Sequence, residues 1–134
     1  MKIEPYLCFN GQCEQAIEFY RQALDAEVPL MMRFKDSPEP HNCADVDPEL
    51  IMHANVQIGG NTLMMSDGNG KGGPEFRGFS LTIAPADRAE AERLFNALAD
   101  GGTIEMPLSE TFWATCFGMV TDRFGVSWMI NLEG

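Results

Sequence analysis

The stretch DRAEAERLFNAL, residues 87–98, carries the pattern that decides the fold of this chain. Asp87 is a favourable helix N-cap, and Glu90 three residues later completes a capping box. The apolar residues that follow recur at the spacing of one helix face, namely Ala91, Leu94, Phe95 and Leu98. Gly101-Gly102 then ends the pattern. This stretch predicts an amphipathic helix that packs its apolar face on another element.

A similar helix face occurs 74 residues earlier in the chain. There Asn10 is the expected N-cap, ahead of an apolar face that includes Ala16 and Ala23. The identity between the two halves is weak, so it is the repeated order of elements that indicates a duplication. The corresponding helix positions are Ile17 with Ala91, Tyr20 with Leu94, and Leu24 with Leu98.

Strand patterns surround both helices in the same order. Short turns, Gly59-Gly60-Asn61 and Asp122-Arg123-Phe124-Gly125, separate the last two strands of each half. The sequence therefore predicts an α+β fold built of two βαβββ modules. The expected strands are Ile3–Phe9, Val28–Phe34, Ile51–Ile58 and Thr62–Ser66, then Phe76–Ala84, Thr103–Met106, Thr115–Thr121 and Val126–Leu132.

Two segments lack any periodicity. Asp36–Leu50 holds three prolines and five acidic residues, which is typical of a surface loop, and Asp67–Glu75 is rich in glycine, as linkers are. We expect a single domain, residues 1–134, with modules at about 1–68 and 75–134. Because each module covers one sheet face with one helix, the other faces must bury against each other or a ligand. This predicts a curved mixed sheet around a cleft lined by strands from both modules.

The composition excludes several classes of function. Nine Lys and Arg residues against twenty Asp and Glu residues give a net charge of −11, which repels nucleic acid and anionic lipid. We find no signal-peptide pattern and no apolar run long enough to span a bilayer. The four cysteines form no C-x-x-C pair. We therefore expect a cytoplasmic protein with reduced thiols that binds neither nucleic acid nor membrane.

Few residues carry recognisable chemistry. A G-x-G-x-x-G pattern spans residues 68–73, but Pro74 and a strand follow where a dinucleotide-binding helix should begin. His53 lies in an expected strand, and Asn55 two residues later shares its face. Asp67, at the end of the neighbouring strand, is a group that could orient His53. His53 and Asp67 are therefore the catalytic candidates.

Stretches along almost the whole chain carry a resemblance to a known family. They are Pro5-Tyr6-Leu7-x-Phe9-x-Gly11, Phe19-Tyr20, Met52-His53-Ala54, Leu63-Met64-Met65-Ser66-Asp67, Phe112-Trp113 and Asp122-Arg123-Phe124-Gly125-Val126-Ser127-Trp128-Met129-Ile130. In these stretches the chain resembles the vicinal oxygen chelate superfamily, which includes glyoxalase I, extradiol dioxygenases and bleomycin-resistance proteins. The resemblance is closer still to its PhnB-like branch, and it implies the tandem βαβββ fold. One departure is Ala114 after Trp113, where glycine is expected.

In metal-dependent members of this superfamily, side chains from four strands hold a divalent ion. The resemblance places the first-strand position on Pro5 and the hairpin position on Met64, or on Met65 if the register shifts by one. The positions in the second half fall on Phe79 and Met129. Proline and phenylalanine offer no donor, and a thioether is a soft ligand. The resemblance therefore implies that the superfamily's metal site is absent, and we expect no cofactor.

Strand alternation then predicts what lines the cleft. If Pro5 faces inward, so do the residues at alternate positions on its strand, and the same holds for Phe79 with Leu81 and Ile83. Trp113, on the loop before the seventh strand, is placed to close over the cleft. We expect a small-molecule-binding protein, and the expected ligand-binding residues are Leu7, Phe9, His53, Asn55, Ser66, Phe79, Trp113, Ser127 and Met129.

Other functions stay open at this point. The resemblance implies a homodimer, and a sequestering role like that of bleomycin-resistance proteins is one form of the binding hypothesis. A second hypothesis is an enzyme that uses His53 as general base with Asp67, since related proteins carry the label demethylubiquinone methyltransferase. A third is a metalloenzyme with relocated ligands, namely His53, Asp67 and a thiol.

Overall fold

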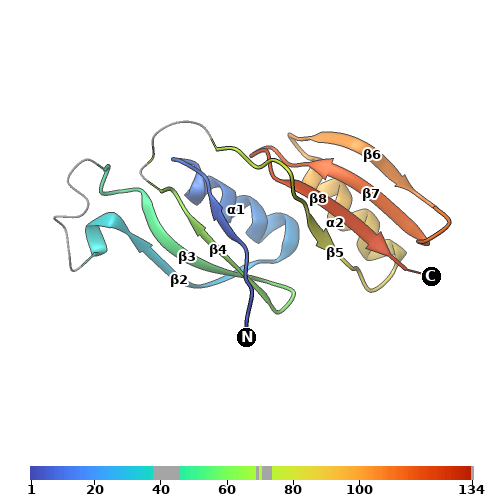
Figure 1. The fold of residues 1–134 in the computed structure, drawn as a ribbon, viewed down its shortest axis with the longest axis horizontal. Coiled ribbons are helices and arrows are strands. Elements are labelled where there is room, and N and C mark those ends of the chain that lie inside the picture. The colour runs from blue at the N-terminus through green and yellow to red at the C-terminus, as the bar shows by residue number, and fades with distance from the viewer. Residues whose placement is uncertain (38–45, 69, 71–73, 134) are drawn as a thin grey trace. The chain divides into compact units, whose positions relative to one another are not determined.

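The fold is shown in Figure 1, a computed structural model that describes residues 1–37, 46–68, 70 and 74–133. Part of the predicted acidic loop, residues 38–45, and part of the predicted glycine linker, residues 69 and 71–73, lie outside the described residues. The chain divides into two compact units, Met1–Pro74 and Glu75–Gly134, and each is described by itself.

The first unit is a four-stranded sheet with one α-helix. Its strand order is β1-β4-β3-β2, in which β1 runs parallel to β4 and the other neighbours are antiparallel. The elements are β1 (Tyr6–Cys8), α1 (Cys13–Leu24), β2 (Glu27–Arg33), the 3₁₀ turn η1 (Phe34–Asp36), β3 (Ile51–Ile58) and β4 (Asn61–Ser66).

The second unit repeats this topology with the strand order β5-β8-β7-β6, and its first strand is again parallel to its last. The elements are β5 (Leu81–Ile83), α2 (Arg88–Ala99), β6 (Thr103–Ser109), β7 (Cys116–Thr121) and β8 (Ser127–Leu132). The predicted α+β fold of two βαβββ modules is therefore confirmed, and Figure 1 shows one helix beside each sheet.

Helix α1 buries one face of the first sheet. Its apolar stripe is fully buried, and the ring of Tyr20 lies 6.4 Å from that of Phe9 just after β1. Leu7 and Met65, paired across β1 and β4, are buried on the same side. Successive strand residues point to opposite faces, so Tyr6 and its partner Met64 lie on the face away from α1, which we call the first open face.

Helix α2 covers the second sheet in the same way. Gly118 on β7 has no side chain at the place where Phe95 of α2 approaches, because a Cβ there would lie 2.8 Å from the Phe95 ring. Its partner Ile130 is fully buried beside it. The residues that alternate with them, including the pair Met119 and Met129, lie away from α2 on the second open face.

The two helices begin in different ways. The predicted Asp87 cap of α2 is confirmed, since Asp87 Oδ1 accepts from the Glu90 N–H at 2.8 Å. The predicted capping box is not completed, because the Glu90 carboxylate accepts at 3.0 Å from the N–H of Ala86, one residue before the cap, instead of from that of Asp87. The predicted Asn10 cap of α1 is wrong. Asn10 has a positive φ of 48° in the preceding turn, and the helix begins only at Cys13.

Three expected strands differ from the observed ones by more than one residue at an end. The first, expected at Ile3–Phe9, is confined to Tyr6–Cys8. The strand expected at Phe76–Ala84 is confined to Leu81–Ile83, because Gly78 with a φ of 78° interrupts the extended chain before it. Strand β6 is longer than expected and reaches Ser109, with register shifts on both sides of Met106. It contains Pro107, which an edge strand tolerates because no backbone N–H donor is needed on its outer side. Among the described residues no helix is long and apolar enough to cross a membrane.

Candidate functional site

The first open face carries a row of side chains that cross-strand pairing brings together. Tyr6 on β1 pairs with Met64 on β4, Met64 pairs with Asn55 on β3, and Asn55 pairs with Leu30 on β2. His53 lies two residues before Asn55 and pairs with Met32. Directly paired residues have Cβ atoms about 5 Å apart, so this face sets polar groups beside thioether and aliphatic surface.

Within this row three side chains form a hydrogen-bonded relay. The Tyr6 hydroxyl lies 3.0 Å from His53 Nδ1, and His53 Nε2 lies 2.8 Å from Asn55 Oδ1. With the carboxamide oxygen of Asn55 facing the ring, Nε2 is the donor, and in the tautomer protonated at Nε2 alone Nδ1 accepts from the Tyr6 O–H. The Tyr6 and His53 rings also contact each other, with centroids 5.6 Å apart. The geometry therefore suits the Nε2-protonated tautomer of His53, in which the Tyr6 O–H donates to Nδ1.

The relay is open to solvent at one end. Tyr6 is 51% exposed, whereas His53 and Asn55 are half-buried. Asn55 was predicted as a site residue because it shares a strand face with His53, and the two side chains are hydrogen-bonded in the structure. Tyr6 was not among the predicted site residues. It lies in the Pro5-Tyr6-Leu7 stretch, and only the pairing of β1 with β4 brings its side chain close to the half-buried His53.

Asp67 does not orient His53, so that predicted pairing is wrong. Its Oδ1 accepts from the N–H groups of Gly11 at 2.7 Å and Cys13 at 2.8 Å, and its Oδ2 accepts from Ile51 N–H at 2.8 Å. Asp67 is 2% exposed. Burial, with the Asp67 carboxylate nearby, raises the pKa of the Cys13 thiol far above its usual range, so this thiol stays protonated. Asp67 is a structural anchor for the start of α1.

Three other predicted ligand-binding residues belong to the interior of the first unit. Leu7 and Phe9 are 2% and 0% exposed on the side that α1 covers, so the expectation that they face a cleft is wrong. The prediction places Pro5 on the inward face, whereas the residue on the open face is Tyr6. Ser66 is buried as well, and its hydroxyl donates to Ile51 O and accepts from Gly68 N–H.

Two further predicted residues, Ser127 and Met129, lie on the second open face. The Ser127 hydroxyl is 2.7 Å from that of Ser80, and Met129 pairs with Thr82 and Met119. Phe79 lies before β5 and is 44% exposed. Leu81 and Ile83 pair with buried residues of β8 and face α2, so their predicted inward orientation is wrong by one residue, as in the first unit.

Trp113 lies in the loop between β6 and β7. Its ring packs edge-on against Phe117 at a centroid distance of 5.3 Å and against Phe112 at 4.7 Å. Trp113 is 47% exposed and Phe112 is 97% exposed. The loop is held by Thr111, whose hydroxyl accepts from the Ala114 N–H at 3.1 Å, so alanine at this position is compatible with an ordered turn.

The positions that the resemblance assigned to metal ligands do not suit a hard cation. Met65 is fully buried, so the hairpin position is Met64, and the side chain beside it is Tyr6 rather than Pro5. In the second unit the corresponding pair is Thr82 and Met129. No three His, Cys, Asp or Glu side chains of the described residues gather as a metal site. The relocated set of His53, Asp67 and a thiol therefore does not form among them; Cys43 lies outside the described residues.

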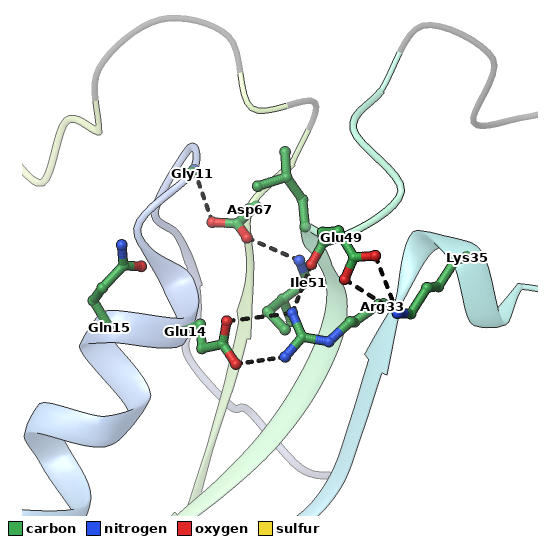
Figure 2. Close-up of a pocket in the computed structure, with 9 residues that line it drawn as sticks. Gly11, Glu14, Gln15, Arg33, Lys35, Glu49, Ile51 and Asp67 are labelled. Carbon is green, nitrogen blue, oxygen red and sulfur yellow. Dashed lines mark hydrogen bonds and ion pairs between the residues drawn. The ribbon is translucent and has the colours of Figure 1, made fainter.

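A separate polar pocket of about 440 Å³ lies at the N-terminal end of α1 (Figure 2). Figure 2 shows Glu14 of α1 and Arg33 of β2 reaching toward each other, and their side chains form an ion pair. Lys35 pairs with Glu49 at 3.1 Å, and Arg33 also donates to the Glu49 carbonyl. The hydrogen bond from Arg33 lowers the pKa of Glu14. Since the cations already have carboxylate partners, we assign this pocket a structural role.

Comparison with known proteins now identifies the chain. Residues 1–131 match the model of the family described as 3-demethylubiquinone-9 3-methyltransferase. The chain belongs to this family. It is 41% identical over 98% of its length to YjdN of Escherichia coli, of which 95% is covered. The resemblance to PhnB-like proteins is thereby confirmed.

Solved structures agree with this assignment. Protein PA1353 from Pseudomonas aeruginosa is 48% identical, with a TM-score of 0.87 over 99% of this chain and 98% of that one. A putative 3-demethylubiquinone-9 3-methyltransferase, PhnB protein, from Bacillus cereus is 27% identical, with a TM-score of 0.82 over 99% and 100%. A glyoxalase-related enzyme from Fulvimarina pelagi is 18% identical with a TM-score of 0.65, over 99% and 88%, and shares the fold. Like them, this PhnB-like chain has a glyoxalase-like fold.

Proposed function

We propose that this PhnB-like protein binds a small, largely apolar molecule on its first open face, with the Tyr6–His53–Asn55 relay as the polar recognition group. The observation that supports the proposal is a fixed hydrogen-bonded relay on a sheet face that α1 does not cover. Small-molecule sites combine mostly apolar walls with a few polar groups of fixed orientation, and this face has that composition.

The relay leaves the N–H donors of Asn55 available to a ligand. Asn55 uses its carboxamide oxygen on His53, so its Nδ2 hydrogens can donate to a ligand acceptor. Met64 and Leu30, which flank Asn55 in the row, supply soft apolar contacts. We therefore infer a neutral ligand that brings a carbonyl-type acceptor to Asn55 and places hydrocarbon on Met64 and Leu30.

A pair of isosteric probes tests this proposal. Acetophenone and α-methylstyrene differ in that a CH₂ group replaces the carbonyl oxygen, and ligand-observed NMR titration gives the affinity of each for the full chain. We expect acetophenone to bind about fivefold more tightly, as one net hydrogen bond allows. Asn55→Leu should abolish that difference, whereas the exposed Gln57→Ala on the same strand is a matched control that should keep it. Equal binding of both probes by the wild-type protein would refute the proposal.

An enzyme is the second candidate, and one observation favours it. The lone pair of His53 Nδ1 points at the Tyr6 hydroxyl while Asn55 holds the ring from the other side, which is the base-and-orienter arrangement of activated side-chain oxygens. In this role the Tyr6 oxygen would take a proton from the ligand as its own proton moves to His53. The family's description names a methyl transfer, and a base of this kind would prepare a substrate hydroxyl for it.

Proton exchange separates the two candidates. An enzyme of this kind should exchange the methyl hydrogens of acetophenone for deuterium in D₂O faster than buffer does, and both Tyr6→Phe and His53→Gln should remove the acceleration. Binding without exchange supports the sequestering form of the proposal. The homodimer and the cytoplasmic location stay predictions, and light scattering on the purified full chain tests the first of them.

A further inference from the structure

The pocket at the N-terminal end of α1 contains space that its ion pairs do not fill. Its volume of about 440 Å³ lies within the range of about 300–1,000 Å³ that small-molecule sites occupy. All of its lining residues belong to the unit Met1–Pro74, and most of them come from α1, the end of β2, η1 and the start of β3 (Figure 2). The structural role of the ion pairs therefore leaves room for a ligand.

The charged side chains of the pocket wall alternate in sign. The guanidinium of Arg33 donates to both carboxylate oxygens of Glu14, and its Nη1 also donates to the carbonyl oxygen of Glu49 at 2.6 Å. The carboxylate of Glu49 in turn accepts from Lys35 Nζ, which lies 3.1 Å from each oxygen. From α1 to η1 the row therefore runs negative, positive, negative, positive (Figure 2).

The groups of this row keep hydrogen-bonding capacity that a ligand can reach. Among the described residues the guanidinium of Arg33 makes three hydrogen bonds, and since it has five donors, two remain. The side chain of Arg33 is 21% exposed, and those of Glu14, Lys35 and Glu49 are between 50% and 62% exposed. Ion pairs with this much exposure are weak, so a ligand can add to them without unfolding the site.

The alternation of charge selects a zwitterion over a simple ion. The wall carries two positive side chains against three negative ones, because Asp67 lines it as well. An anion that approaches Arg33 also approaches Glu14, and a cation that approaches Glu14 also approaches Arg33, so repulsion offsets attraction for either. A ligand whose ammonium and carboxylate are neighbours can instead place each charge beside its opposite.

We propose that this pocket binds a small zwitterion of the α-amino-acid class, with the ligand carboxylate at Arg33 and the ligand ammonium at Glu14. Leu50, which is half-buried in the pocket wall, offers apolar contact to an aliphatic side chain of the ligand. This site is independent of the one proposed on the first open face, since it shares no residue with the Tyr6–His53–Asn55 relay.

Three matched probes test the proposal. They are L-leucine, 4-methylpentanoate, which is leucine without the ammonium group, and 3-methylbutylamine, which is leucine without the carboxylate. Ligand-observed NMR titration of the full chain at low ionic strength should show leucine binding about fivefold more tightly than either single ion, as one partly exposed ion pair allows. Leucine should also shift the amide signals of Gly11, Glu14 and Gln15, which line the pocket. No binding of leucine, or equal binding of leucine and a single ion, would overturn the proposal.

Two charge-neutral variants assign the two ends of the ligand. Glu14→Gln should weaken leucine about fivefold and leave 4-methylpentanoate no weaker, whereas Arg33→Gln should weaken leucine and leave 3-methylbutylamine no weaker. Loss of structure would weaken all three probes, so this opposite pattern separates a direct contact from a folding defect. A variant that is folded by circular dichroism and binds leucine as the wild type does would overturn the proposal.

Two controls locate the binding. Glu75→Gln removes an exposed carboxylate of the other unit and should change no affinity. Asn55→Leu should leave leucine binding unchanged although it changes the first open face, so failure of one proposal does not imply failure of the other. If Asn55→Leu abolishes leucine binding, leucine binds the first open face and the pocket is not its site.

Discussion

Replacing Asp67 by asparagine should destabilise the protein strongly although the change is nearly isosteric. The carboxylate accepts N–H groups from Gly11, Cys13 and Ile51 at 2.7 to 2.8 Å, in a site that is 2% exposed. Asparagine can keep the acceptor for Gly11 and Cys13, but its NH₂ then faces the Ile51 N–H, so two donors meet. A buried hydrogen bond to a charged group contributes about 1.5–3 kcal/mol, and the two bonds that are kept weaken when the acceptor becomes neutral. We expect a loss of about 3 kcal/mol.

Urea unfolding measures this loss. With a slope of about 2 kcal/mol per molar urea for a chain of this size, the midpoint should fall by about 1.5 M. Far-UV circular dichroism follows both units, whereas tryptophan fluorescence follows the unit Glu75–Gly134, which contains both tryptophans. Asp122→Asn is the matched variant, because Asp122 accepts from Val126 N–H and from the Trp128 indole in a similarly buried site.

The control for the charge change itself is Glu75→Gln. Glu75 is largely exposed and makes one long ion pair of 3.9 Å with Arg77, so its loss should change stability by less than about 0.5 kcal/mol. If Asp67→Asn shifts the midpoint no more than Glu75→Gln does, the role of Asp67 as the buried anchor of α1 is refuted.

Three further predictions concern single contacts. Glu14→Gln should cost no more than about 1 kcal/mol at neutral pH, because the ion pair with Arg33 is partly exposed. Arg33 lowers the folded-state pKa of Glu14, so the stability that this pair adds is present at neutral pH and is lost as the pH falls through that lowered pKa. The urea midpoints of variant and wild type should therefore converge on acidification. Asp87→Ala removes the α2 cap and should lower stability by about 1 kcal/mol in thermal melts, with Asp87→Ser largely restoring it. Gly118→Ala places a Cβ 2.8 Å from the Phe95 ring and should cost about 1–3 kcal/mol by urea unfolding; an unchanged midpoint would show that α2 can shift.

Much of the fold could be predicted because its signals are local. The capping residues Asp87 and Glu90 act within one helical turn, and the predicted strand at Ile51–Ile58 has the observed bounds. Gly59 and Gly60 both adopt positive φ in the hairpin turn, as the turn chemistry requires. The predicted start of α1 was wrong because that start depends on a residue distant in the sequence. The Asp67 carboxylate accepts the N–H groups of Gly11 and Cys13.

The candidate site was predictable only in part. His53 and Asn55 are two residues apart on one strand, so alternation alone placed them on one face. Their link to Tyr6 crosses 47 residues of sequence and depends on the parallel pairing of β1 with β4. A one-residue error in the facing of β1 moved Leu7 and Phe9 to the wrong side, because a register change of one residue reverses every side chain of a strand.

By itself, the sequence determined the order of elements, the duplication and the family, because periodicity, caps and turns are properties of short segments. Only the tertiary structure decided what Asp67 and Asn131 do. Asp67 looked like a partner for His53 in the sequence, yet it binds backbone N–H groups that lie 16 to 56 residues away along the chain. Alternation from Met129 placed Asn131 on the same strand face, but only the structure shows that its oxygen is buried without a donor among the described residues. Both outcomes depend on which backbone groups meet after folding, and no local pattern encodes that.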